Sequence, residues 1–300
     1  EKHPKMLQDE ASVYKLLTGG TEQLHAYIQE GKYDSVICSH VFSGLLLRQT
    51  LKEYPMELKT AFVATDYTCS PGTARSELDH YFIPSRSLTA EFIAQGVPAG
   101  KIVPSGIPVR KEFYAQGDKA KAKRKLGIDP HHTHLLMMCG SMGCGPLEKL
   151  TKLLSGSMTN TMELSIVCGT NEKLKEELIE KFGETPSIHI YGFVRDISTM
   201  MDSADLYLTK PGGLSTTEAA AKGLPMVFID AVAGCEEYNL NYFVSLGGAV
   251  TADEPEELSQ LAIRLMENQN KRYAMANALD TAIPVNAALR IYDVMKGALS

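Results

Sequence analysis

The stretch Lys210–Pro225, K-P-G-G-L-S-T-T-E-A-A-A-K-G-L-P, decides the fold of this chain. It lies between two short apolar runs of strand character, Ala204–Thr209 and Met226–Asp230. The local order is therefore strand, loop, helix, strand. We predict that the helix ends with Gly223 as its C-terminal cap, because Pro225 cannot continue a helix.

The glycine-rich start of this stretch has the composition of an anion-binding turn. Gly212 and Gly213 let the backbone turn tightly and approach a ligand closely. Ser215, Thr216 and Thr217 place hydroxyl groups around the first helical turn, where unpaired N–H groups and the helix dipole favour an anion. The order and the residue types predict a nucleotide-sugar site.

Composition limits the classes of protein to consider. With 300 residues, 44% hydrophobic and 22% charged, the chain can bury a large core, and its length predicts two domains. A net charge of −6 argues against a nucleic-acid partner, and no apolar run approaches the roughly 20 residues of a membrane span. The six cysteines are scattered without a C-x-x-C pair, which indicates a reducing cytoplasm.

Runs of strand character recur along the chain, and helical patterns separate most of them. They are 35–39, 60–65, 80–84, 101–104, 134–139, 162–168, 187–191, 206–209 and 226–230. This alternation predicts an α/β protein with parallel sheets, in which ligands gather at the carboxyl ends of the strands.

A change of composition near Tyr114–Lys123 predicts a domain boundary, since a strand end containing proline gives way there to a polar stretch. We expect one Rossmann-like domain over residues 1–117, a second over 118–282, and an amphipathic helix in 283–300 that packs back on the body. The basic cluster Lys119–Lys125 is interpreted as a solvated helix face or linker, with a patch for lipid headgroups as the alternative.

A second glycine-rich loop, Cys139–Pro146 (C-G-S-M-G-C-G-P), also joins a strand to a helix. Gly140, Gly143 and Gly145 allow the turn to present N–H groups inward, and proline suits the first helical position. The alternative is a tight turn without a ligand. The presence of two such loops favours phosphate binding.

Three further segments supply candidate donor contacts. Glu218, about one turn into its helix, is placed to accept hydrogen bonds from two ribose hydroxyls, although an exposed helical glutamate is the alternative. Gly169 and Asn171 end one strand and open a helix, while Phe193 and Val194 are placed to flank a flat base. Core packing explains Phe193 nearly as well.

The segment Gly234–Asn241 (G-C-E-E-Y-N-L-N) is interpreted as a loop whose acids and amides read sugar hydroxyls by directional hydrogen bonds. Solvated surface is the alternative for its two adjacent acids. The histidines at 131, 132 and 134 lie near Cys139 and Cys144, but their spacing matches no familiar zinc site, so we expect no metal.

Four motifs together resemble glycosyltransferase family 28, in its branch of monogalactosyl- and processive glucosyl-diacylglycerol synthases. They are T-D-Y at 65–67, D-H-Y-F-I-P-S at 79–85, S-G-I-P-V-R at 105–110, and the Lys210 stretch itself. The resemblance covers essentially the whole chain. It implies a GT-B fold of two Rossmann-like domains, a donor held by the second domain, and inversion at the anomeric carbon without a bound metal or other cofactor.

The resemblance also implies roles for single residues. Glu218 would bind the ribose, the two glycine loops the diphosphate, and the Glu236 segment the hexose. The expected donor-binding residues are Gly140, Ser141, Gly143, Gly169, Asn171, Phe193, Val194, Lys210, Pro211, Gly212, Gly213, Ser215, Thr216, Glu218, Glu236, Glu237 and Asn239.

Two departures from the family pattern affect what can be carried over. Cys235 stands where relatives have Gln before the acidic residue, so the identity of the donor sugar stays open. The family begins with a strand and a G-G-G-H loop that do not occur in this sequence. We therefore expect the N-terminal domain to be incomplete.

The expected reaction moves a hexose from a UDP-sugar to a diacylglycerol-type lipid, with Asp66 or His40 as the base. His40 at a strand end is also readily explained as a structural residue. A UDP-sugar 2-epimerase of the same fold and a noncatalytic donor-binding module are the alternatives. The expected location is the cytoplasm, with peripheral association at the inner face of the cell membrane.

Overall fold

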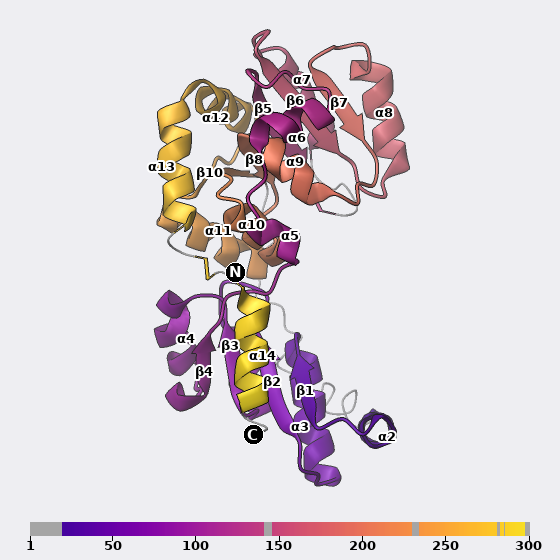
Figure 1. Ribbon diagram of the computed structural model, residues 1–300, viewed down its shortest axis with the longest axis vertical. Coiled ribbons are helices and arrows are strands. Elements are labelled where there is room, and N and C mark those ends of the chain that lie inside the picture. Colours follow the sequence, from indigo (N-terminus) through magenta and orange to yellow (C-terminus); the bar gives the residue numbers. More distant parts are fainter. Residues whose placement is uncertain (1–19, 141–145, 230–233, 281–282, 285, 298–300) are drawn as a thin grey trace. The chain divides into compact units, whose positions relative to one another are not determined.

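The chain folds into two compact units, each built on its own parallel sheet (Figure 1). The computed structural model describes residues 20–140, 146–229, 234–280, 283–284 and 286–297. Unit 1 comprises residues 1–107 and 287–300, and unit 2 comprises residues 108–286.

Unit 1 contains a four-stranded sheet with the strands in chain order, β1-β2-β3-β4, all parallel. The strands are β1 (Ser35–Cys38), β2 (Lys59–Val63), β3 (His80–Ile83) and β4 (Ile102–Pro104). The helices are α2 (Thr21–Gly31), α3 (Val41–Glu53), α4 (Thr89–Ala94) and α14 (Ala287–Gly297), with 3-10 turns η2 (Thr73–Ser76), η3 (Arg86–Leu88) and η4 (Ala99–Lys101).

Helix α14, the last helix of the chain, belongs to the core of unit 1. Its buried residues Ile291 and Met295 pack with Ala61, Val63 and Phe82 of β2 and β3. Alternation along the strands turns Phe62, Tyr81 and Ile83 to the opposite face, where they form a second apolar cluster. Both faces of the sheet therefore bury apolar side chains, as expected for parallel strands.

Unit 2 contains a six-stranded parallel sheet in the order β10-β9-β8-β5-β6-β7. The strands are β5 (Thr133–Met138), β6 (Met162–Val167), β7 (Ile188–Tyr191), β8 (Leu206–Thr209), β9 (Met226–Phe228) and β10 (Ala249–Thr251). The helices are α5 (Lys111–Tyr114), α6 (Lys119–Lys125), α7 (Leu147–Ser155), α8 (Glu172–Phe182), α9 (Ile197–Ser203), α10 (Gly213–Ala221), α11 (Cys235–Leu246), α12 (Pro255–Glu267) and α13 (Gln269–Asp280). Counted along unit 2, this strand order is that of a Rossmann fold.

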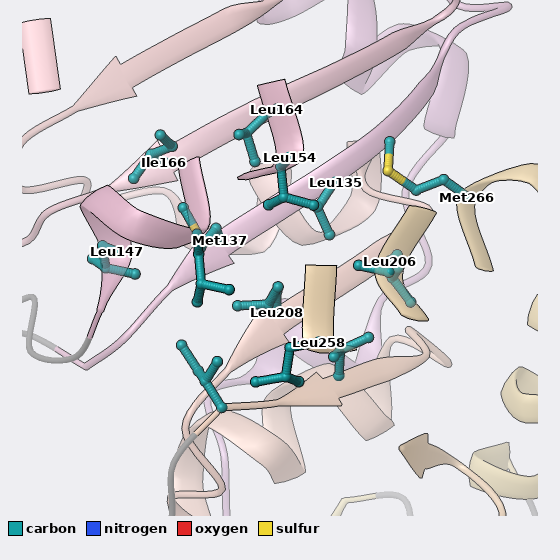
Figure 2. Close-up of a cluster of buried hydrophobic side chains, with 14 of the residues drawn as sticks. Leu135, Met137, Leu147, Leu154, Leu164, Ile166, Leu206, Leu208, Leu258 and Met266 are labelled. Atoms are coloured by element: carbon teal, nitrogen blue, oxygen red, sulfur yellow. The ribbon is translucent and has the colours of Figure 1, made fainter. Parts of the chain in front are cut away.

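The main core of unit 2 lies on one face of this sheet. Leu135 and Met137 of β5 pack there with Leu206 and Leu208 of β8, beneath side chains of α7 and α12 that include Leu154 (Figure 2). These strands are nearly continuous apolar runs, which is typical of parallel strands buried on both faces. Full burial of so many large side chains is the main stabilising contribution to the unit.

The sequence prediction of two parallel α/β sheets is confirmed, and each predicted strand is present within two residues of its expected ends. The sequence prediction did not include β10, whose three residues (A-V-T) give too short a pattern. At the end of α10, Gly223 adopts a left-handed φ of 62°. Its N–H bonds to Ala220 and that of Leu224 to Ala219, which makes the predicted C-terminal cap a Schellman motif.

The segment after residue 107 is fastened to unit 2 by polar contacts. The Gln116 side chain donates to the Ala221 carbonyl at 3.1 Å, and the Gly117 N–H donates to Asp202 at 3.2 Å. Lys222, almost fully buried, donates to the Ala115 carbonyl and pairs with Asp202 at 2.8 Å. The structure thus divides the chain between residues 107 and 108, ahead of the change in composition near residue 117.

The basic cluster Lys119–Lys125 is engaged within unit 2. Lys119 and Lys123 both pair with Asp205, at 2.8 and 2.7 Å, and Lys125 pairs with Asp196 at 2.8 Å. Burial raises the pKa of Asp205, but Lys119, Lys123 and the His134 N–H together outweigh burial and lower that pKa to about 2. Three of the cluster's cations therefore pair with acids of neighbouring elements, and Lys123 is buried, while Lys119 and Lys125 stay exposed as a solvated helix face implies.

We expect Lys222→Met to destabilise unit 2 by about 3 kcal/mol, because it leaves the largely buried Asp202 carboxylate without its cation. The double variant Lys222→Met/Asp202→Asn should recover part of that loss, because no buried charge is left unpaired. Urea unfolding followed by circular dichroism measures both, with the exposed Lys173→Met as control. Equal losses in the single and double variants would contradict the account.

Candidate functional site

The central pair of strands in unit 2 places the starts of the two glycine-rich segments side by side. β5 pairs directly with β8, Met138 lying opposite Thr209. From β5 the chain proceeds outward to β6 and β7, whereas from β8 it proceeds the other way, to β9 and β10. This is the topological switch point of the sheet, the place where open α/β sheets bind ligands. The Cys139 loop and the Lys210 loop follow the carboxyl ends of these two strands.

A side chain of α11 is hydrogen-bonded to the loop after β8 and fixes its backbone. Gly212 is the N-cap of α10, and its N–H donates to the Lys210 carbonyl at 2.9 Å. Asn239 of α11 is fully buried, and its side-chain amide donates to the Pro211 carbonyl at 3.0 Å. The loop is thereby fixed so that the N-terminus of α10, with its unpaired N–H groups, ends at the switch point.

The loop after β5 begins with Gly140, which has a left-handed φ of 72° and therefore turns the chain sharply out of the strand. Among the described residues, no heavy atom would lie within 4 Å of a Cβ added there, and the left-handed backbone conformation by itself favours glycine. The predicted contacts Ser141 and Gly143 lie outside the described residues.

The hydroxyl groups of α10 have partners within their own helix. Thr216 donates to the Gly212 carbonyl at 2.8 Å and Thr217 to the Gly213 carbonyl at 2.6 Å, and both side chains are fully buried. Ser215 is half-buried and donates to Gly212 at 3.2 Å. Ser215 is thus the most accessible of the three hydroxyls, while Thr216 and Thr217 brace the first turn.

Glu218 is a half-buried carboxyl on the same helix, two residues beyond Thr216. Burial raises its pKa to about 7, while the Arg110 guanidinium lowers that pKa and the Glu112 carboxylate raises it, each by a smaller amount. Beneath it on β8, Tyr207 is fully buried and its hydroxyl has no hydrogen-bond partner in the described part of the chain. A partly desolvated carboxyl of this kind is typical of a binding site.

The remaining predicted donor contacts occupy the same edge of the sheet, beyond β6 and β7. Gly169 follows β6, and the Asn171 side chain caps α8 by accepting from the Leu174 N–H at 3.1 Å. Phe193 follows β7 and is 64% exposed, so core packing does not explain it, and Val194 beside it is half-buried.

The prediction of a loop over Gly234–Asn241 is wrong. Helix α11 begins at Cys235, so Glu236 and Glu237 lie in its first turn, where acidic side chains are stabilised by the helix dipole. Glu236 is half-buried and Glu237 is exposed. Asn239, predicted to contact the sugar, is buried and donates a hydrogen bond to the Pro211 carbonyl. The spacing of apolar and polar residues in the sequence does not indicate this contact.

In unit 1 both candidate bases follow the carboxyl ends of neighbouring strands. His40 lies two residues beyond β1 and Asp66 three residues beyond β2, and these strands are parallel neighbours. His40 is exposed, and its Nδ1 accepts from the Phe42 N–H at 3.2 Å, which caps α3. Asp66 is half-buried.

Three histidines of unit 2 make hydrogen bonds through their side chains. His134 is fully buried between Ser165 and Ser203, at 2.8 and 3.1 Å, and burial lowers its pKa to about 3, which keeps it neutral. His132 and His189 share the Glu163 carboxylate, at 2.8 and 2.9 Å. Among the described residues, no group of three or more His, Cys, Asp or Glu side chains is arranged to hold a metal ion.

Comparison with known proteins shows which proteins the chain resembles. A model described as monogalactosyldiacylglycerol (MGDG) synthase matches residues 3–109, and one described as glycosyl transferases group 1 matches residues 147–280. A processive diacylglycerol beta-glucosyltransferase of Staphylococcus carnosus is 31% identical over 230 residues, which are 76% of this chain and 58% of that protein. The chain is thus similar to glycosyltransferases over most of its length. It spans just under three fifths of the length of that relative.

A second relative extends the match over more of the chain. The processive diacylglycerol beta-glucosyltransferase of Bacillus cytotoxicus is 28% identical over 278 residues, covering 92% of this chain and 71% of that protein.

Solved structures agree with the predicted GT-B fold. The Staphylococcus aureus MnaA–UDP structure aligns with a TM-score of 0.71 at 15% identity, over 96% of this chain and 82% of that one. Acinetobacter baumannii MurG aligns with a TM-score of 0.69 at 16% identity, over 94% and 78%. At this identity the likeness shows the fold alone, and it confirms the GT-B prediction.

We predict that replacing Glu218 by Gln stabilises the protein increasingly as pH rises from about 5 to about 8. The raised pKa means that, between the unfolded value of 4.5 and about 7, the folded state binds more protons at this carboxyl than the unfolded state. Its contribution to stability therefore falls as pH rises through that window, by an amount on the order of 2 kcal/mol. Unfolding midpoints of the two proteins across pH measure the effect, and a difference independent of pH would refute it.

We predict that Asn239→Leu weakens UDP binding about tenfold, because the Pro211 carbonyl loses its donor and the loop loses its anchor. Isothermal titration calorimetry measures the affinity. Asn241→Leu, an exposed position on the same helix, is the matched control and should bind as the parent does. If Asn239→Leu and Asn241→Leu bind UDP equally well, the hydrogen bond from Asn239 to the Pro211 carbonyl is not needed for UDP binding.

Proposed function

We propose that this protein transfers a hexose from a uridine diphosphate sugar to the hydroxyl of a diacylglycerol-type lipid. The observation that carries the proposal is the side-by-side ending of β5 and β8, with the N-terminus of α10 following β8 and the partly desolvated Glu218 on that helix. The similarity to glycosyltransferases supports a transferase, and both relatives are named as diacylglycerol glucosyltransferases, which supports a diacylglycerol acceptor. The donor would be a substrate of the reaction, and the proposed chemistry uses no cofactor.

In the proposed donor site, unit 2 holds the nucleotide. The diphosphate would lie at the N-terminus of α10 and on the loop after β5, where backbone N–H groups and the helix dipole stabilise negative charge. The ribose hydroxyls would donate to ionised Glu218, and Phe193 would pack against the base. Glu236 and Glu237, at the start of α11, would face the hexose. MnaA, whose structure contains UDP, has the same fold.

The proposed reaction is a single displacement at the anomeric carbon. The base removes the proton of the lipid hydroxyl as its oxygen forms the new bond, and the bond from the anomeric carbon to the diphosphate oxygen breaks on the opposite side. The electron pair of that bond leaves with UDP, where the helix N-terminus and loop N–H groups stabilise it. We assign the base to Asp66, with His40 as the second candidate.

The lipid acceptor implies work at a membrane surface. No helix in the described ranges of the chain combines the length and the apolar composition that crossing a bilayer requires. We propose peripheral association with the inner face of the cell membrane, from the cytoplasm, since UDP-sugars and diacylglycerol would meet there. The MGDG synthase model, matching residues 3–109, supports assigning the lipid to unit 1.

We predict that Asp66→Asn lowers turnover at least a hundredfold while UDP affinity is unchanged, because the amide cannot accept the proton. Transfer of labelled hexose from UDP-glucose and UDP-galactose to vesicles containing diacylglycerol measures turnover. The acid-to-amide variant Asp34→Asn, exposed in the same unit, is the control. Full activity in Asp66→Asn with loss in His40→Gln would transfer the role to His40.

Two outcomes would contradict the proposed function as a whole. Epimerisation of the sugar without any acceptor would identify an epimerase. UDP binding with no transfer to any lipid acceptor would identify a donor-binding module.

A further inference from the structure

The loop that carries Asp66 is fastened at both ends within unit 1. At its start, just beyond β2, the Ala64 N–H donates to the Phe82 carbonyl of β3 at 2.9 Å. At its end the Ser70 carbonyl accepts from the Thr73 N–H at 3.1 Å and from the Thr73 hydroxyl at 2.7 Å. Hydrogen bonds therefore fix the backbone on both sides of the candidate base.

Between these two ends, the Glu91 carboxylate of α4 holds the loop. Its Oε1 accepts from the Thr68 hydroxyl at 2.7 Å and from the Cys69 N–H at 2.7 Å. Thr68 and Cys69 are each only 5% exposed, so water has little access to either donor. Removing the Glu91 carboxylate would leave two buried donors unsatisfied, which is costly unless the loop moves.

The place of Glu91 is fixed by the core of unit 1. Phe92, the next residue on α4, is fully buried and belongs to the same apolar cluster as Cys69, Tyr81 and Ile83. The Glu91 backbone is held in addition by the Gln95 N–H, which donates to the Glu91 carbonyl at 3.0 Å. The carboxylate is therefore a short link between a well-packed helix and the loop that carries Asp66.

We infer that Glu91 is a positioning residue for Asp66: by holding Thr68 and Cys69, it sets where the Asp66 carboxylate lies beyond the carboxyl end of β2. The inference rests on the proposed function, because that proposal makes Asp66 the base. It goes further in giving Glu91 a part in the reaction, through the loop. A base must come within about 3 Å of the hydroxyl, and a displacement of about 1 Å can lower the rate a hundredfold.

Asp79 provides a matched control at the other end of the same strand. Its Oδ2 accepts from the Thr60 N–H at 2.9 Å and from the Thr60 hydroxyl at 2.8 Å, and Thr60 is 3% exposed. Thr60 lies near the amino end of β2. Both carboxylates thus hold a backbone N–H and a threonine hydroxyl of unit 1, but Glu91 does so beside Asp66.

The first experiment measures kcat for transfer of labelled hexose from UDP-glucose and UDP-galactose to vesicles containing diacylglycerol, together with unfolding midpoints. We expect Glu91→Ala to lower kcat about thirtyfold with UDP affinity unchanged. Asp79→Ala should lower the unfolding midpoint comparably and change kcat less than twofold. Glu91→Gln, which keeps an acceptor oxygen, should recover most of the turnover. Equal kcat values in Glu91→Ala and Asp79→Ala overturn the inference.

A milder pair of variants keeps the test valid if Glu91→Ala fails to fold. Thr68→Val and Thr60→Val remove only the hydroxyl that donates to Glu91 or to Asp79. We expect Thr68→Val to lower kcat about fivefold and Thr60→Val to leave it unchanged. The same kcat in both variants would count against the inference.

The Asp66→Asn background separates positioning from a merely structural role. If Glu91 acts through Asp66, adding Glu91→Ala to Asp66→Asn should lower kcat less than twofold further, because the base that Glu91 positions is already absent. A thirtyfold loss in both backgrounds would mean that Glu91 does not act through Asp66, and the inference would be wrong.

The second experiment needs no substrate and separates this inference from the proposed function. Amide hydrogen exchange of the full chain, read by mass spectrometry, should be faster over residues 64–70 in Glu91→Ala and as in the parent in Asp79→Ala. Unchanged exchange in Glu91→Ala overturns the inference. If the parent transfers no hexose to any acceptor, the proposed function fails, while exchange still decides whether Glu91 fixes the Asp66 loop.

Discussion

The direct pairing of β5 with β8 is the constraint on which the proposed donor site depends. Because the chain leaves these two strands in opposite directions, the helices that follow them diverge and leave their N-terminal ends at one edge of the sheet. Two strands separated in sequence by the whole of β6 and β7 thereby end side by side, and Gly140 and the Lys210 loop follow their carboxyl ends. Without this pairing each loop would be an isolated strand-to-helix turn, and such a turn does not by itself indicate a ligand-binding site.

Burial stabilises the scaffold beneath this edge of the sheet, but it disfavours the charged form of Glu218 on α10. Beneath it, apolar strands and the buried Asn239 amide hold the loop backbone, so the turn that would meet a diphosphate is already in place before a ligand binds. On α10, burial of Glu218 disfavours its charged form and raises its pKa to about 7. That desolvation destabilises the empty protein, and hydroxyl donors from a ribose would offset it. Burial away from water thus stabilises the scaffold and, at Glu218, leaves a carboxyl whose charged form a ligand's hydroxyl groups would stabilise.

Much of the fold was predictable because its signals are local. Apolar runs such as 162–168 and the Gly223–Pro225 helix end gave strands and a cap that the structure confirms. The contacts that refine the site were not predictable, since they join residues far apart in sequence. Asn239 meets Pro211 across 28 residues and Lys222 meets Ala115 across 107. The polar residues of the Glu236 segment predict a loop, whereas the structure has a helix there. The buried positions of that helix, Asn239 and Phe243, lie four residues apart on one face.

The position of the boundary at residues 107 and 108 bears directly on how the donor site is built. A division by composition at residue 117 assigns α5 to the first domain, where Arg110 and Glu112 have no relation to a nucleotide. The structure assigns α5 to unit 2 through Ala115, Gln116 and Gly117, all of which bond to α9, α10 or the residue after it. The S-G-I-P-V-R motif therefore ends inside unit 2. Its arginine pairs with Glu112 on α5, and α5 packs against the helix that carries Glu218, so residues that precede the unit's first strand form part of the surroundings of the proposed ribose site.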